Sequence, residues 1–242
     1  MAGLKKLLIK KNIAIITCYD ASFASYLSNT NVDALLVGDS LGILIKGQAS
    51  TREVKMSEVL YHTESVRRGA PLMPIISDMP INSFANKNMA LKNAKLLINA
   101  GADMVKIEGE NNIIEIVKYL NINKIFVCGH IGFMPQANKI NKSKNEDLLT
   151  KAKKLEEAGL KMLVLSMTSE SDDKAITNQL SIPTISFRSS SFCNGGVEIL
   201  YELLGITSTS ISNDKKNTHL MNQSTILHVL EKFITKIHKR KN

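Results

Sequence analysis

Two kinds of segment alternate along the chain, and this alternation limits the fold more than any other feature. Short apolar runs rich in β-branched residues recur at 13–19, 34–38, 74–77, 104–107, 125–129, 162–165 and 184–187. Between them lie longer segments in which apolar residues return every three or four positions, at 57–68, 88–99, 112–120, 147–157 and 196–204. The first kind is typical of buried strands and the second of amphipathic helices.

This repeat predicts a parallel sheet, and the number of units favours a closed barrel. Seven strands are visible, and we expect a weaker eighth at 206–211 followed by a closing helix at 224–236. Eight strand–helix units build a (β/α)₈ barrel, whereas an open doubly wound sheet is the alternative. The chain has 242 residues and no visible linker, so we expect one barrel domain across 1–242.

The net charge, the cysteines and the lengths of the apolar runs indicate which kinds of partner and which cellular compartment to expect. The net charge is +9, but the lysines are scattered and the basic tail at 236–241 has no interleaved aromatic residue, so we expect no nucleic-acid partner. A positive field favours anionic substrates. The three cysteines, Cys18, Cys128 and Cys193, are far apart and suggest neither a disulfide nor a zinc site. No apolar run approaches the ~20 residues that span a bilayer, so we expect a cytoplasmic protein without membrane contact.

Ionisable side chains gather where the predicted strands end, and this is the end at which a parallel barrel carries its active site. In chain order they are Asp20, Asp39, Asp78, Lys106, Glu108 and His130. Residues i and i+2 of a strand share a face, so Lys106 and Glu108 project together, and Asp39 is expected to continue the row of Leu35 and Val37.

Three converging carboxylates, Asp39, Asp78 and Glu108, predict a metal site. Without a partner they would repel one another, and burial would raise their pKa values. A hard cation such as Mg²⁺ takes oxygen ligands and removes the conflict. Lys106 beside them could bind a substrate carboxylate or stabilise an enolate oxygen. Asp20 is more typical of a helix N-cap, and His130 fits either a scaffold or a catalytic role.

Several short motifs that contain these ionisable residues, or lie near them in the sequence, are typical of one protein family. They lie at 17–20, 36–42, 61–63, 66–71, 78–80, 100–109, 129–132 and 135–136. Through them the chain resembles the ketopantoate hydroxymethyltransferase family, almost without interruption over 13–136 and more weakly to about residue 206.

The resemblance implies a barrel of the phosphoenolpyruvate/pyruvate-handling kind that forms a homo-oligomer, decamer-like. It implies transfer of a hydroxymethyl group from 5,10-methylenetetrahydrofolate to 3-methyl-2-oxobutanoate, giving 2-dehydropantoate in pantothenate biosynthesis. Mg²⁺ would be ligated by Asp39, Asp78 and Glu108. The oxo acid would be bound by Asp39, Ser40, Asp78 and Lys106, with Lys106 and His130 as catalytic candidates.

The second half of the chain departs from the family pattern. Where the family has a general base, a Glu in a Leu-Val-Leu-Glu context, this chain has Ser166, and a serine hydroxyl is too weak a base at neutral pH. Glu170, His130 or a metal-bound hydroxide are the candidate substitutes. The loops at 137–147 and 187–191 also differ. Three functions stay open: the hydroxymethyltransferase, another Mg²⁺-dependent 2-oxo-acid enolate enzyme, and a non-catalytic oxo-acid-binding or assembly homologue.

Overall fold

Eight parallel strands close into a barrel. The computed structural model describes residues 2–134, 136, 139–140 and 147–207. Around the ring the strands follow chain order, and β4 pairs with β5 while β9 lies beside β1. They are β1 (Ile13–Thr17), β2 (Ala34–Val37), β3 (Ile75–Asp78), β4 (Met104–Glu108), β5 (Val127–Met134), β7 (Met162–Ser166), β8 (Thr184–Phe187) and β9 (Gly195–Glu198). The predicted barrel is therefore confirmed, and the open sheet is excluded.

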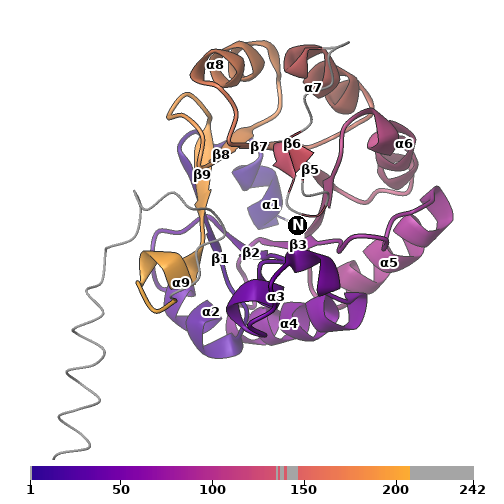
Figure 1. Ribbon diagram of the computed structural model, residues 1–242. Coiled ribbons are helices and arrows are strands. Elements are labelled where there is room, and N and C mark those ends of the chain that lie inside the picture. Colours follow the sequence, from indigo (N-terminus) through magenta and orange to yellow (C-terminus); the bar gives the residue numbers. More distant parts are fainter. Residues whose placement is uncertain (1, 135, 137–138, 141–146, 208–242) are drawn as a thin grey trace, which may run out of the picture. The chain divides into compact units, whose positions relative to one another are not determined.

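Helices connect successive strands from β1 to β8 and surround the ring, whereas β8 and β9 are joined without a helix (Figure 1). They are α2 (Ala21–Ser28), α3 (Leu41–Leu44), α4 (Met56–Gly69), α5 (Lys87–Asn99), α6 (Ile114–Ile122), α7 (Leu148–Glu157) and α8 (Glu170–Gln179), with 3₁₀ turns η1 (Thr51–Glu53) and η2 (Asn111–Ile113). Asp20 is the N-cap of α2, since its Oδ1 accepts the Phe23 amide at 2.9 Å. A short strand, β6 (Lys139–Ile140), pairs antiparallel with β5. No helix in the described part of the chain has both the length and the apolarity to cross a membrane.

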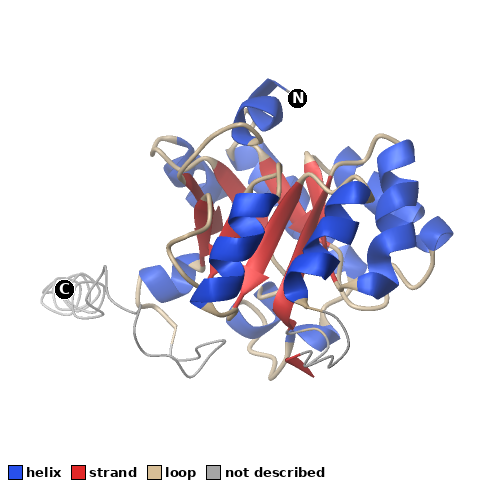
Figure 2. Cartoon of the chain, turned by 90° about the horizontal axis from the view of Figure 1, so that it is seen from above, coloured by secondary structure: helices blue, strands red, loops and turns tan. Residues whose placement is uncertain are grey.

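Alternate residues of every strand point into the barrel and form its core. One buried cluster draws on all eight strands and is joined by Leu4 and Leu7 of α1 (Ala2–Leu7). α1 thus covers the end of the barrel at which the strands begin (Figure 2). The cluster includes Met104, Cys128 and Val164, so residues two positions further along these strands share the inward face.

The strand that closes the barrel is β9 and not the expected eighth strand at 206–211, of which 206–207 are not in a strand and 208–211 lie outside the described residues. The helix expected at 196–204 was also wrong, because Gly195–Glu198 is a strand and only Leu200–Leu203 is helical, as α9. A Cβ at Gly195 would lie 2.3 Å from the Ile13 carbonyl oxygen, so β9 approaches β1 too closely for any other residue. The expected closing helix at 224–236 lies outside the described residues.

Chain contacts divide the protein into two compact units, Met1–Val197 and Glu198–Asn242. The first unit holds nearly all of the barrel. The described part of the second unit contains α9. The prediction of one domain over 1–242 stays a prediction.

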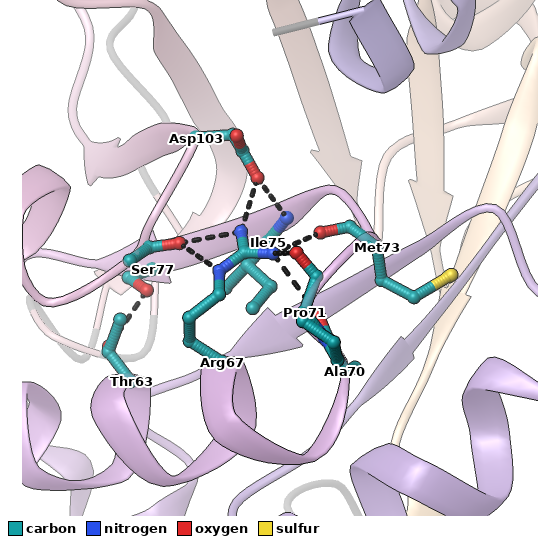
Figure 3. A network of polar contacts seen from close by, with 9 residues as sticks. Thr63, Arg67, Ala70, Pro71, Met73, Ile75, Ser77 and Asp103 are labelled. Carbon is teal, nitrogen blue, oxygen red and sulfur yellow. Dashed lines mark hydrogen bonds and ion pairs between the residues drawn. The ribbon is translucent and has the colours of Figure 1, made fainter.

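Arg67 of α4 donates hydrogen bonds to the loops that lead into β3 and β4 (Figure 3). Its guanidinium donates to the carbonyl oxygen of Gly101 through Nε and NH2, at 2.9 and 2.6 Å. NH2 also lies 2.6 Å from Asp103 Oδ2, which in turn accepts the Ile75 amide at 3.0 Å. NH1 donates to three further carbonyl oxygens, those of Ala70, Pro71 and Met73. The arginine thereby links two loops at the amino ends of the strands.

Candidate active site

Buried charged residues meet at the carboxyl ends of β2, β3 and β4. Asp78 ends β3, and Lys106 and Glu108 continue the inward row that Met104 begins on β4. Their exposed fractions are 2% for Asp78 and 6% each for Lys106, Glu108 and Asp39. The strand ends therefore bring together the four residues on which the metal and oxo-acid predictions depend.

Asp39 reaches this cluster by a different route from the one expected. Leu36 belongs to the inward cluster, so Leu35 and Val37 face the opposite side of β2, and the predicted row of Leu35, Val37 and Asp39 was wrong. The strand ends at Val37, and Asp39 lies in the turn that follows. Its backbone amide donates to Asp78 Oδ2 at 2.9 Å. The turn, and not strand alternation, places Asp39 beside Asp78.

Lys106 and Asp78 form a buried ion pair, with Nζ 2.5 Å from Oδ1. Burial alone would lower the pKa of Lys106, but the negative charges of Asp78, Glu108 and Asp39 outweigh it and raise that pKa. Lys106 is therefore a fixed cation in the barrel mouth, and its position is set by Asp78.

Glu108 pairs with His130 of β5. His130 Nδ1 lies 3.0 Å from Glu108 Oε1, and both side chains are almost fully buried. Burial raises the pKa of Glu108, but His130, Lys106 and the amide of Gln136 outweigh that effect and lower it. His130 Nε2 is buried and has no hydrogen-bond partner among the residues that the structure describes. Nδ1 likewise has no hydrogen bond of good geometry in the described structure, so the two ring nitrogens differ in that Nδ1 faces Glu108 and Nε2 does not.

Gln136 joins the two sides of the cluster, a role that the sequence did not suggest. Its Nε2 donates to Asp39 Oδ2 at 2.8 Å and to the Met79 carbonyl oxygen at 3.1 Å. Its backbone amide donates to Glu108 Oε2 at 3.1 Å. The only sequence signal was its place in the Pro135-Gln136 motif, because the partners Asp39 and Glu108 are distant in sequence.

The cluster carries more negative than positive charge. Burial, and then repulsion from Asp78 and Glu108, raises the pKa of Asp39 well above its usual range, although Lys106 opposes this. Three carboxylates face one lysine, and their oxygens are the ligand type that Mg²⁺ prefers. A divalent cation therefore fits the chemistry of the donor set. In their present rotamers, however, no three His, Cys, Asp or Glu side chains among the described residues are gathered closely enough to hold a metal ion.

The other residues predicted for the site are Ser40, Ser166 and Glu170, and only the first two are buried. Ser40 is buried next to Asp39 in the chain, and its Oγ is 2.7 Å from the Tyr19 hydroxyl. Ser166 ends β7 in the inward row of Val164; it is fully buried, and its Oγ has no hydrogen-bond partner in the described structure. Glu170 begins α8 and is exposed, so the structure does not place its carboxylate in the inward row.

Comparison with protein families identifies the family of the chain. The family model described as ketopantoate hydroxymethyltransferase matches residues 3–241. The chain belongs to this family. Its relatives include the 3-methyl-2-oxobutanoate hydroxymethyltransferases of Buchnera aphidicola subsp. Acyrthosiphon pisum (strain 5A), 40% identical over 94% of this chain and 90% of the relative, and of Wigglesworthia glossinidia brevipalpis, 44% identical over 81% and 78%. By family, the protein is a hydroxymethyltransferase.

Solved structures support the fold independently of the sequence family. Phosphoenolpyruvate phosphomutase from Streptomyces platensis subsp. rosaceus superposes with a TM-score of 0.70 at 14% identity, covering 98% of this chain and 87% of that one. 2,3-Dimethylmalate lyase, a member of the PEP mutase/isocitrate lyase superfamily, gives a TM-score of 0.64 at 14% identity, covering 98% and 96%. At this identity the likeness shows the fold alone, which is a (β/α)₈ barrel.

Proposed function

We propose that the protein transfers a hydroxymethyl group from 5,10-methylenetetrahydrofolate to 3-methyl-2-oxobutanoate, consuming one water and giving 2-dehydropantoate for pantothenate biosynthesis. The observation that carries the proposal is the buried Lys106–Asp78 pair among further carboxylates, at the barrel end where such enzymes bind substrate. The family to which the chain belongs supplies the identity of the reaction.

Lys106 is the group that receives the oxo acid. Its ammonium is fixed and charged, so it can bind the substrate carboxylate and later stabilise negative charge that develops at the keto oxygen. Asp78 orients Lys106 through the 2.5 Å contact. Gln136 holds Asp39 and Glu108 in place from the other side.

We propose Asp39, Asp78 and Glu108 as the ligands of Mg²⁺. When bound, Mg²⁺ would supply a Lewis acid that polarises the keto group and neutralises the excess negative charge of the cluster. The support for this is that three buried carboxylates, those of Asp39, Asp78 and Glu108, lie around the single ammonium group of Lys106.

Removal of the C3 proton needs a base that Ser166 does not provide. The inward face offers three buried polar atoms without a described hydrogen-bond partner, Ser166 Oγ and the two ring nitrogens of His130, of which Nδ1 faces Glu108 Oε1 at 3.0 Å. An imidazole nitrogen is the stronger base, and a proton on Nδ1 facing Glu108 leaves Nε2 as the acceptor. We therefore assign the C3 proton to His130 Nε2. As that C–H bond breaks, its electron pair forms the enolate. The enolate carbon bonds to the methylene carbon of the donor while one C–N bond of the donor breaks and its nitrogen takes a proton. Water then replaces the second C–N bond, which gives the hydroxyl group of the product and releases tetrahydrofolate.

A second function is favoured by one observation, the absence of a carboxylate at Ser166. A related enzyme could form the enolate and use another electrophile. The test is C3 deuteration of 3-methyl-2-oxobutanoate in D₂O with Mg²⁺, with and without methylenetetrahydrofolate. Exchange with transfer supports the hydroxymethyltransferase, exchange without transfer supports the second function, and binding without either supports a non-catalytic homologue.

The substitutions Lys106→Ala and Asp78→Asn test whether the oxo acid binds at the proposed site. Both should weaken binding of the oxo acid, because one removes the cation and the other its orienting partner. Oxo-acid affinity that is unchanged in both variants, measured by calorimetry, would contradict the proposed site.

A further inference from the structure

Asp173 of α8 is fully buried and joins the loops that follow β7 and β8. Its Oδ1 accepts the Thr168 hydroxyl, and its Oδ2 accepts the hydroxyl of Ser189. Oδ2 also accepts the Ser190 amide at 2.8 Å, and the two hydroxyl oxygens lie 2.6 Å from each other. A buried charge is costly unless hydrogen bonds satisfy it, and here neutral donors of two loops do so. Together these four residues form the Asp173 network.

Both loops pass through a left-handed residue just before they reach Asp173. Met167, with φ 50°, directly follows β7 and precedes Thr168. Arg188, with φ 52°, directly follows β8 and precedes Ser189. Residues other than glycine keep this conformation only where neighbouring contacts impose it, and such strain is typical of functional sites. Asp173 binds the next residue of both turns, so its carboxylate supplies those contacts.

Thr168 carries this constraint to β5. A Cβ at Gly132 would lie 2.9 Å from Thr168 Cγ2, so the threonine methyl occupies the space beside Gly132 that a side chain would need. Gly132 is two residues beyond His130 and pairs with Ser166 of β7. A displaced Thr168 would therefore change the packing at the end of β5, next to the proposed base.

We propose that Asp173 is a positioning residue for the proposed base: acting through Thr168, it fixes the ends of β5 and β7 so that His130 Nε2 faces C3 of the oxo acid. The assignment rests on the proposed function and adds the residue that maintains its geometry. The groups proposed to bind the oxo acid lie on or directly after β2, β3 and β4, whereas the network follows β7 and β8. Loss of the network should therefore slow proton removal more than it weakens binding.

Two substitutions in the full-length protein test this inference. Asp173→Asn replaces one acceptor oxygen by an amino group that cannot accept the loop hydroxyls. Thr168→Val removes the hydroxyl, keeps the shape of the side chain, and decides the question if Asp173→Asn does not fold. Glu156→Gln is the matched control. Glu156 of α7 accepts the Ser181 amide and hydroxyl at 2.6 and 2.7 Å, so it too joins a helix to a loop, but at the amino end of β8.

The measured quantity is C3 deuterium exchange of 3-methyl-2-oxobutanoate with Mg²⁺ in D₂O, compared at equal folded fraction. We expect kcat to fall about tenfold in Asp173→Asn and in Thr168→Val, because small displacements of a reacting group cost rate steeply. KM for the oxo acid should stay within about twofold, since its binding groups are unchanged. The double variant should be no more than about twofold slower than either single variant, because both changes break one contact.

Glu156→Gln should match the wild type in kcat and KM. Unchanged kcat in both network variants would overturn the assignment. A fall in kcat of the same size in Glu156→Gln would also overturn it, because the effect would then be one of general stability. Losses that multiply in the double variant would show that Asp173 does not act through Thr168.

Failure of this assignment can be distinguished from failure of the proposed function. If the wild type catalyses exchange and transfer and both network variants match it, the assignment is wrong and the proposed function stands. If the wild type shows neither exchange nor transfer, the proposed function fails, and backbone hydrogen exchange read by mass spectrometry over 127–134 decides the assignment without substrate. Faster exchange in both network variants, but not in Glu156→Gln, would keep Asp173 as a positioning residue for β5; unchanged exchange would overturn it.

Discussion

Asp39 occupies a position that is unfavourable for its own charge. Burial and the carboxylates of Asp78 and Glu108 raise its pKa in the folded protein above that of the unfolded chain. Between these two pKa values the folded state binds more protons than the unfolded state, so the stability contributed by Asp39 is lost as the pH rises through the folded pKa. At neutral pH without metal, Asp39 therefore destabilises the fold.

We predict that Asp39→Asn stabilises the metal-free protein at pH 7, by on the order of 1 kcal/mol for each unit by which the pKa is raised. The amide oxygen can still accept the hydrogen bond from Gln136. The gain should shrink toward about pH 4, where the aspartate of the unfolded chain is itself protonated. Urea unfolding in EDTA over a pH series measures this. Mg²⁺ should stabilise the wild type and have little effect on the variant; equal stabilisation of both would exclude Asp39 as a ligand.

Ser166 stands where the family has a Glu base, so a carboxylate can be introduced there in addition to His130. It lies in the inward row of β7, so Ser166→Glu places a carboxylate on the barrel interior. We predict that C3 deuterium exchange rises, since general bases typically contribute about 10²–10⁴ in rate. Ser166→Ala, which adds no base, is the control. Rates should be compared at equal folded fraction, because a further buried carboxylate lowers stability. Normal binding of Mg²⁺ and oxo acid, with exchange no faster than in Ser166→Ala, would contradict the prediction.

At the scale of helices and strands, the sequence predicted the position of a side chain correctly where the residue lies inside one regular element. Lys106 and Glu108 were correctly placed on one face because both lie inside β4. Asp39 was misplaced because β2 ends at Val37, so the alternation of faces stops before it. β9 was read as the start of a helix because Gly195 serves a close approach to β1 that local periodicity does not record. Gln136 was missed because its role depends on partners that only the closed barrel brings near.

The Arg67 contacts give an element-scale prediction. Arg67→Ala removes the side-chain donor to carbonyl oxygens of two loops and leaves the Asp103 carboxylate with the Ile75 amide but without its ion pair. We expect a loss of about 2–4 kcal/mol in the free energy of unfolding, as for other partly buried charged hydrogen-bond networks. Arg68→Ala is the matched control, because the side chain of Arg68 is 66% exposed and its nearest acid is the exposed Glu64 at 3.7 Å. Surface changes of this kind stay within about 0.5 kcal/mol.

The Arg67 variant also separates stability from function. Arg67 lies at the amino ends of the strands, and the proposed site lies at their carboxyl ends. Oxo-acid affinity measured well below the unfolding temperature should therefore match the wild type. A large loss of affinity in Arg67→Ala at full folded fraction would show that the two ends of the barrel are coupled.

For the barrel as a whole, closure depends on the contact between β9 and β1. A barrel has no free edge only if this last pair forms, and every inward row, including the site, depends on the ring being closed. The Ile13 amide donates to the Asn194 carbonyl oxygen at 2.9 Å next to this contact. Gly195 and Gly196 follow directly, and they differ sharply in the space around them.

We predict that Gly195→Ala strongly destabilises the barrel and that Gly196→Ala does not. A Cβ at Gly195 would lie 2.3 Å from the Ile13 carbonyl oxygen and 2.7 Å from the Ile13 Cβ, so β1 and β9 would have to separate. At Gly196 the nearest atom, the Ser186 carbonyl oxygen, is 3.8 Å away. Overpacking of this kind costs about 1–3 kcal/mol or more, whereas the control should stay within about 0.5 kcal/mol. Urea unfolding measures both changes, and hydrogen exchange of the β1 amides shows where the barrel opens. If the two variants were equally stable, β9 could not be the strand that closes the ring.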